Sequence, residues 1–484
     1  ADAFNVAFRI PNVLQNLFGE GVLSASFIPV YARLRAGTDD ARRREVAGVV
    51  FGVLALGVAV LALAGVLAAP AIVSVLAPGF SGDQRLLTIQ LVRILFPGAG
   101  LLVLSAWCLG VLNTHGRFLL SYASPVAWNL AMITALVGWG RRSGANDVVV
   151  ALAWASVVGS VIQLGVQWPS VRYLLGEWRP RLRSRAPEAA TVFRNFLPVF
   201  IGRGVTQLSG FVDVMVASTL VQGSASMLAN AQAVYMLPVS LFGMSVSAAA
   251  LPGLSTVAGD ASDEARKQLR RMLDDRLRQV AFFVVPSAVA LMALGPAIIA
   301  ILFQGGAFGD VEAEWQRWTL AAAGLGLLGA TLGRLYSTTL YALHDTRTPQ
   351  RAAISRVVVA ATVGVAAATW GVPYAQLHPR FGIVALLAAS SLAAWLEWAL
   401  LRSHVARRLG GGEPALVLII RVWVAAILAA SLALAVAAMP FVQGLGGLWS
   451  GLLTLAAFGA AYLGAATWLR IPQVRSLRKR LPGG

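Results

Sequence analysis

Between Glu45 and Arg470, apolar runs about 20 residues long or longer alternate with short polar breaks. A hydrocarbon core about 30 Å thick needs roughly 20 residues of helix to cross it. Helices are the default at that depth, because the backbone must there bond to itself. Transmembrane β-strands would give alternating segments of about 10 residues, which this sequence lacks. We therefore predict an all-α polytopic membrane protein.

The composition agrees with this class. Charged residues make up 12% of the 484 positions, whereas a soluble protein carries about 25%. A formal charge of +18 would suggest nucleic-acid binding in a soluble chain. Here the basic residues lie at the ends of apolar runs, where they fix topology and meet anionic lipid. We therefore expect anionic membrane lipids as partners and no nucleic acid.

The apolar segments number about thirteen and have boundaries good to a few residues. They are predicted at 3–32, 47–77, 86–112, 118–140, 147–175, 195–221, 227–257, 279–303, 316–342, 353–372, 382–401, 415–438 and 448–469.

Arginine is concentrated in alternate breaks between these segments. The rich breaks are 33–44, 179–185, 266–278, 347–351, 407–408 and the tail 470–480. The intervening breaks hold little beyond Arg85, Arg141, Arg142 and Arg380. Since cytoplasmic loops are rich in Lys and Arg, the rich side and the C-terminus are predicted to be cytoplasmic and Ala1 to lie outside. A helix missing upstream of Ala1 would make fourteen spans.

Two halves of the chain resemble each other at an interval of about 225–230 residues. Residues 27–31, 69–73 and 113–117 resemble 250–254, 295–299 and 344–347, in that order. The interval covers six spans, so both copies keep one orientation and are expected to form two six-helix lobes related by a pseudo-twofold axis along the membrane normal. The predicted domains are 1–185, 186–405 and 406–484, the last holding two additional helices and a basic tail.

Ionisable groups at membrane depth are functional candidates, because burying charge in lipid is unfavourable. Arg9 and Glu20 lie about three helical turns apart, as do Arg203 and Asp213. Each pair lies in or near the first segment of its repeat. Two facing bundles would bring the four into one cationic cavity, which suits an anionic substrate such as a phosphate ester.

Other charges in the apolar segments have a simpler interpretation. Arg93 and Arg334 are equally consistent with structural pairing, with snorkelling to an interface or with function. Arg356, Arg402 and Arg421 lie near predicted cytoplasmic ends and are expected to be anchors. Glu397 lies about one turn from Arg402 and is expected to pair with it.

No enzyme signature is present in the sequence. There is no phosphate-binding loop of the ATPase type. The four histidines lack metal-ligand spacing. We therefore expect a transporter rather than an enzyme, with no metal and no cofactor.

Several motifs resemble the MurJ (MviN) family of lipid II flippases. They include the opening Ala1–Phe4, Arg9–Asn12, Leu17–Gly21 and Phe27–Val30, then Leu112–Thr114, Arg117, and the loop Asp345–Pro349. The resemblance implies the multidrug/oligosaccharidyl-lipid/polysaccharide exporter superfamily, fourteen helices with the first absent here, and a groove for the lipid tail in the final pair. It adds Asn12 to the cavity. It also marks Asn113, Arg117, Asp345 and Arg347 as gating or cytoplasmic-loop residues.

The chain departs from the family pattern at two cations. Where the family often carries arginines after the Pro-Asn of its second helix, this chain has Gln15 and Asn16. Where the family often has another before a proline in its eighth helix, this chain has Ala233 and its neighbours. Our hypothesis is that Arg203 replaces the lost eighth-helix cation, with Arg9 as the second.

The resulting prediction is a flippase in the bacterial inner (plasma) membrane that moves lipid II, an undecaprenyl-pyrophosphate-linked precursor, to the outer leaflet by alternating access. Cell-wall synthesis enzymes are candidate partners. Three alternatives stay open: a flippase for another lipid-linked oligosaccharide such as an O-antigen or capsule precursor, a drug/cation antiporter of the same superfamily, and a non-transporting scaffold.

Overall fold

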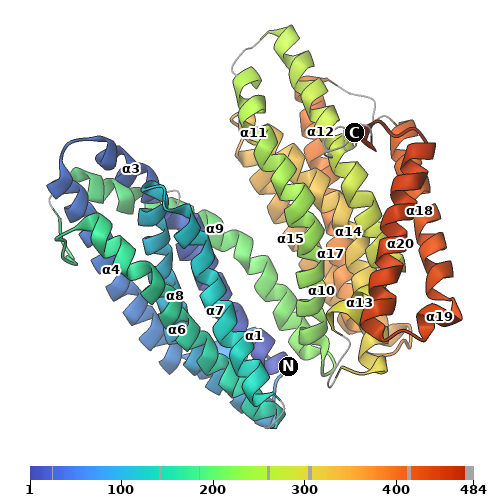
Figure 1. The fold of residues 1–484 in the computed structure, drawn as a ribbon, viewed down its shortest axis with the longest axis horizontal. Helices are drawn as coiled ribbons and strands as arrows, with labels where there is room; N and C mark the ends of the chain where they lie inside the picture. The colour runs from blue at the N-terminus through green and yellow to red at the C-terminus, as the bar shows by residue number, and fades with distance from the viewer. Residues whose placement is uncertain are drawn as a thin grey trace. The chain divides into compact units, whose positions relative to one another are not determined.

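The computed structural model describes residues 1–23, 26–140, 144–184, 186–258, 262–303, 308–410 and 416–474. Within these ranges, side chains are described except at 19–21, 198–199, 201–209, 252 and 416–417. The chain forms two compact units, Ala1–Ser226 and Met227–Gly484. Both units are built from helices (Figure 1). The predicted domain boundaries at 185/186 and 405/406 stay predictions.

Within its described residues, the first unit contains nine helical elements and the start of a tenth. They are α1 (Asp2–Leu14), η1 (Gln15–Leu23), α3 (Ile28–Ala36), α4 (Asp40–Leu67), α5 (Ala69–Leu76), α6 (Gly82–Thr114), α7 (Phe118–Trp139), α8 (Ala145–Leu175) and α9 (Pro187–Thr219).

The second unit begins within α10 (Ser224–Pro238). It continues with η2 (Val239–Met244), α11 (Ser245–Ala258), α12 (Asp263–Ala293), α13 (Gly295–Leu302), α14 (Asp310–Ala342), α15 (Arg347–Ala366), η3 (Ala367–Gly371), α16 (Val372–Tyr374), α17 (Phe381–Leu409), α18 (Leu416–Ala437), α19 (Pro440–Gln443) and α20 (Gly447–Trp468).

Eleven helices in the described part of the chain are long and apolar enough to cross a membrane. They correspond to eleven of the predicted segments and confirm a polytopic all-α fold. The predicted span 195–221 lies within the 33-residue helix α9. The predicted span 3–32 is divided among α1, the π-helix η1 and α3.

The order of elements repeats between the units and supports the predicted duplication. In each unit a helix, a π-helix and a second helix come first: α1, η1 and α3, then α10, η2 and α11. A long helix and an eight-residue helix follow, and each short helix carries a proline, Pro70 or Pro296, in its first turn. Proline is tolerated there because the first helical N–H groups have no partner within the helix. A 33-residue helix comes next in both units, α6 and α14.

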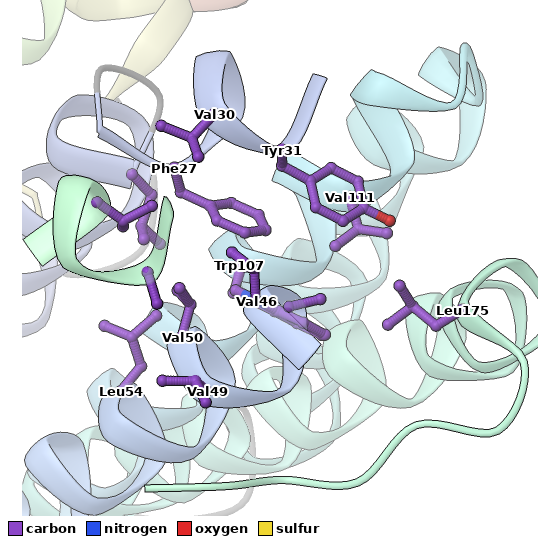
Figure 2. Packing of buried hydrophobic residues seen from close by; sticks show 14 of the residues in the cluster. Phe27, Val30, Tyr31, Val46, Val49, Val50, Leu54, Trp107, Val111 and Leu175 are labelled. Atoms are coloured by element: carbon purple, nitrogen blue, oxygen red, sulfur yellow. The ribbon is translucent and has the colours of Figure 1, made fainter. Parts of the chain in front are cut away.

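An aromatic core fills the first unit where α3, α4 and α6 meet (Figure 2). Trp107, Phe27 and Tyr31 are fully buried there. The rings of Phe51 and Trp107 have centroids 4.8 Å apart, and Phe27 lies 5.1 Å from Tyr31. Such pairs add about 0.5–1.5 kcal/mol each beyond area burial, so this end of the unit is expected to be rigid.

A buried polar chain links α6, α7 and α8. Gln163 Nε2 donates to Ser105 Oγ at 2.9 Å, and Ser105 Oγ donates to Gln167 Oε1 at 2.8 Å. Gln167 Nε2 then donates to Ser124 Oγ at 2.5 Å. Hydrogen bonds between such side chains fix helix register inside a membrane bundle.

The last two long helices, α18 and α20, pack on each other and on other helices of the second unit. α18 contacts α12 and α20 contacts α13. The Tyr462 hydroxyl donates to the Phe282 carbonyl at 2.6 Å. Gly451 lies so close to the Ala297 carbonyl that a Cβ there would be 2.6 Å from its oxygen. Small residues allow this close approach of membrane helices.

Candidate functional site

Arg9 of α1 lies directly on the surface of α9. Its guanidinium covers Gly210, where any Cβ would overlap it. Asp213, three residues further along α9, acts electrostatically on Arg9. Residues three apart share a helix face, so glycine provides the space and the aspartate the opposite charge. The structure thus brings together two of the four residues predicted to line the cavity.

The other predicted cavity residues are described less fully. Glu20 lies in η1 and Arg203 in α9, and these two elements pack together. The side chains of Glu20 and Arg203 lie outside the described residues, so their roles stay predictions. Asn12 is exposed on α1.

Asp2 has a structural role that sequence reasoning missed. Its carboxylate accepts hydrogen bonds from the backbone N–H of Gly223 at 2.6 Å and of Ser226 at 2.8 Å. The Ser226 hydroxyl donates to the same carboxylate at 2.6 Å, and Asn5 Nδ2 donates to that hydroxyl at 3.2 Å. An acidic side chain that binds the free N–H groups of a first helical turn is a capping interaction. The one sequence signal for Asp2 was its position in the opening motif Ala1–Phe4.

The second unit contains an ion pair that differs from the predicted one. Glu397 of α17 pairs with Arg356 of α15 at 3.1 Å, not with Arg402. Residues five apart on a helix point about 140° away from each other. Arg402 instead lies over the Trp398 ring, 5.2 Å from its centroid. The prediction of a Glu397–Arg402 pair is therefore wrong, and Arg356 is more than an anchor.

Arg334 of α14 belongs to the same charged group. Both Arg334 and Arg356 act electrostatically on Tyr235 of α10, as does Glu397. The Glu397 side chain is 12% exposed and that of Arg356 is 41% exposed. Two arginines and one glutamate thus act electrostatically on one tyrosine in the second unit. Arg93, by contrast, is exposed on α6, with no ion pair in the part of the chain that the structure describes.

Comparison with known proteins identifies the family. A family model described as lipid II flippase MurJ matches residues 1–456. The probable lipid II flippase MurJ of Rhizobium meliloti is 32% identical over 452 residues, covering 90% of this chain and 80% of the relative. The lipid II flippase MurJ of Burkholderia cenocepacia is 33% identical over 365 residues, covering 74% and 70%. The chain belongs to the MurJ lipid II flippase family.

Solved structures agree on the fold. A lipid II flippase MurJ in an inward closed conformation matches with a TM-score of 0.76 at 21% identity, covering 97% of this chain and 92% of that one. An inward-facing multidrug resistance MATE family transporter of the MOP superfamily matches with a TM-score of 0.70 at 17% identity, covering 84% and 90%. Both matches show the fold, which this chain shares with a MurJ flippase and with a transporter described as belonging to the MOP superfamily. The lipid II flippase is confirmed at the level of the family, and the alternatives are not favoured.

The loop motif shared with the MurJ family has a clear structure at Asp345. Its carboxylate accepts from the Thr348 N–H at 3.0 Å and the Thr348 hydroxyl at 2.8 Å, which caps α15. Arg408, at the end of α17, pairs with it at 2.7 Å. The backbone hydrogen bond from Thr348 is the main cause that lowers the pKa of Asp345, and Arg408 contributes. Arg347 begins α15 and is exposed.

The matching loop of the first unit, residues 113–117, is bound by a side chain of the neighbouring helix α3. Arg35 of α3 donates to the Thr114 carbonyl, next to Asn113. Asn113 is half-buried, and Arg117 is exposed just before α7. These contacts hold both loops in place. The gating role of the four loop residues stays a prediction.

Proposed function

We propose that this protein binds the pyrophosphate of lipid II between its leaflet-crossing helices and carries it from the cytoplasmic to the outer leaflet by alternating access. No covalent step is required, so the protein acts as a transporter and not as an enzyme. Family membership supports this proposal, as do the eleven membrane-length helices found among the described residues. Family membership supports a place in the bacterial plasma membrane, and the arginine-rich breaks support a cytoplasmic C-terminus.

The observation that carries the proposal is Arg9 held on Gly210 beside Asp213. A guanidinium presents planar paired donors that match phosphate oxygens. A cation at membrane depth needs a counter-charge in the empty state, and Asp213 supplies one. An incoming pyrophosphate would take over that role, so binding exchanges an internal pair for a pair with substrate.

We propose that further cations compensate for the family arginines missing at Gln15 and Ala233. Arg203 is the first candidate, since it lies on α9 two helical turns before Gly210. Arg334 and Arg356 in the second unit are the next, because both lie near Tyr235 on the helix that lacks the family arginine. The polyprenyl tail would stay in lipid or against α18 and α20. The membrane potential is a suitable driving force for the transport cycle, since it supplies about 2.3 kcal/mol per charge per 100 mV.

Complementation of a flippase-depleted bacterial strain tests this function. The wild-type chain is expected to restore growth and to clear accumulated lipid II. Arg203→Ala is expected to abolish both, whereas Arg421→Ala, on the lipid-exposed α18, is expected to retain both. Full growth with Arg203→Ala would remove that residue from the site. Accumulation of a different lipid-linked oligosaccharide on depletion would favour the other cargo.

A further inference from the structure

An arginine-lined pocket in the first unit lies away from the residues discussed so far. It has a volume of about 1410 Å³ and is formed by the start of α4, the end of α8 and the segment 176–181 that follows. Arg44, Arg172, Arg179 and Arg181 line it, together with Glu45 and Glu177. The arginine-rich breaks that contribute these residues place the pocket at the predicted cytoplasmic end.

The segment 176–181 is fixed to α4 by two glycines. A Cβ on Gly48 would lie 3.4 Å from the carbonyl carbon of Arg179, and one on Gly52 would lie 2.9 Å from the backbone of Arg181. The Arg181 N–H donates to the Gly48 carbonyl at 3.1 Å. Glycines four apart usually allow two helices to approach. Here they receive an extended chain and thereby fix the positions of two arginines.

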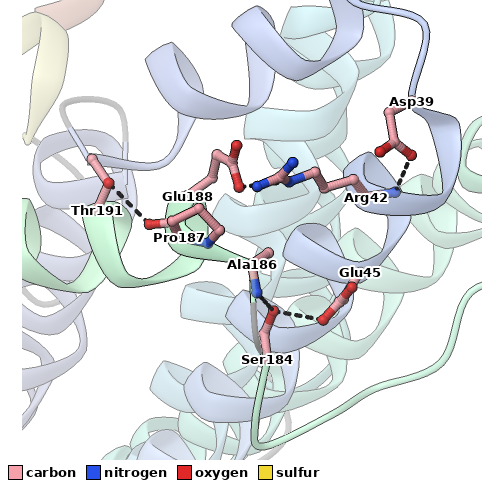
Figure 3. Close-up of polar contacts among 8 residues, drawn as sticks. All are labelled: Asp39, Arg42, Glu45, Ser184, Ala186, Pro187, Glu188 and Thr191. Carbon is pink, nitrogen blue, oxygen red and sulfur yellow. Dashed lines mark hydrogen bonds and ion pairs between the residues drawn. The ribbon is translucent and has the colours of Figure 1, made fainter.

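Polar contacts hold the chain that follows this segment (Figure 3). Ser184 donates to Glu45 at 2.7 Å and accepts from the Ala186 N–H at 2.9 Å. Arg42 pairs with Glu188 of α9 at 2.8 Å. These bonds occupy Glu45, whereas Arg172, Arg179 and Arg181 have no side-chain hydrogen bond or ion pair within the described residues. The pocket therefore presents three guanidinium groups that have no ion pair within the described residues, and Glu177 lies beside them in the lining.

The surface below the pocket suits a lipid chain. Val158, Ile162 and Val166 are exposed on α8 at intervals of four residues, so they share one face. From Val158 to Arg172 the helix rises about 21 Å, which exceeds half of a hydrocarbon core about 30 Å thick. Trp168 and the exposed Tyr173 lie at the end of α8 that lines the pocket. Aromatic residues are common at such membrane interfaces.

We propose that this pocket binds the phosphate of an anionic phospholipid of the cytoplasmic leaflet, with an acyl chain lying along α8. Free phosphate shares the recognition chemistry, but the apolar stripe and the aromatic residues favour the lipid. The site is independent of the transport cavity, because none of its lining residues belongs to the proposed cargo site.

Native mass spectrometry of the purified full chain in detergent tests the proposal. Phosphatidylglycerol is titrated against phosphatidylethanolamine with wild type, with R172Q/R179Q/R181Q, and with R183Q/R266Q/R271Q. The last variant removes the same charge from exposed arginines that do not line the pocket. We expect wild type to prefer phosphatidylglycerol and the pocket variant to bind it about tenfold more weakly. The control variant is expected to bind it as wild type does.

A single Arg172→Gln variant guards against misfolding, since Arg172 is exposed on α8 and has no side-chain hydrogen bond or ion pair within the described residues. It is expected to weaken phosphatidylglycerol binding several-fold with an unchanged unfolding transition. Equal lipid binding by wild type and the pocket variants would overturn the proposal. Inorganic phosphate that displaces the lipid at equal concentration would overturn the lipid as the ligand, as would a preference for phosphatidylethanolamine.

Discussion

Gly52 offers a sharp test of how the first unit is held together. Substitution by alanine places a methyl group against the backbone of Arg181, which cannot yield as a flexible side chain could. The segment 176–181 must then lift from α4. The hydrogen bond from the Arg181 N–H to the Gly48 carbonyl is lost, which removes about 1 kcal/mol.

Lifting the segment also disturbs Trp178. Its ring lies 5.3 Å from Phe51, 5.4 Å from Trp107 and 5.9 Å from Trp168. Each such pair contributes about 0.5–1.5 kcal/mol. If two of the three are weakened, the total loss is about 2–4 kcal/mol. Replacing a helical glycine by alanine returns about 0.5–1 kcal/mol, so the expected net loss is about 1–3 kcal/mol.

Gly57 provides a matched control on the same helix. A Cβ at Gly57 meets nothing within 4 Å, so Gly57→Ala is expected to keep or slightly raise the free energy of unfolding. Both variants are measured by denaturant unfolding in detergent, followed by tryptophan fluorescence. Equal unfolding free energies for Gly52→Ala and Gly57→Ala would refute the claim that Gly52 is needed for the segment 176–181 to pack on α4.

Three further predictions concern polar contacts. Asp345→Asn is expected to lower the unfolding free energy by about 1–2 kcal/mol. Because folding lowers the pKa of Asp345, the difference in stability between wild type and variant is present above pH 3.8 and shrinks as the pH falls through the folded-state pKa. A difference that stays the same at acid pH would contradict this prediction. Asp2→Ala removes the cap on Gly223 and Ser226 and is expected to reduce unfolding free energy by about 2 kcal/mol, so a neutral result would be evidence against the cap. Arg356→Gln leaves the Glu397 carboxylate unpaired and is expected to lower the unfolding free energy by about 1–3 kcal/mol. Adding Glu397→Gln is expected to restore part of this loss, and no restoration would argue against the ion pair.

Features set by local pattern could be predicted from the sequence. Runs of apolar residues located the membrane helices, since length and hydropathy suffice for that. Pro70 and Pro296 occupy matching positions in the two repeats, and each lies in the first turn of a short helix. The energetic penalty of charge in lipid selected Arg9 and Asp213 as candidates. Helix spacing grouped them with Glu20 and Arg203 rather than with each other, and their place in a cavity stays a prediction.

Features set by contacts between distant segments could not be predicted. Arg356 and Glu397 lie on different helices, and helix spacing alone could not select that pair over Glu397 and Arg402. Gly48 and Gly52 carried a spacing typical of helix packing, yet a loop occupies them. Both cases depend on tertiary packing, for which one sequence holds no local signal.

Transport of lipid II in proteoliposomes tests the central claim most directly. Purified wild-type protein is expected to move a fluorescent lipid II across the bilayer. Arg9→Ala, which removes the guanidinium from Gly210 and Asp213, is expected to lose that activity, while Arg421→Ala keeps it. A full rate of lipid II movement with Arg9→Ala would contradict the claim that this arginine grips the pyrophosphate.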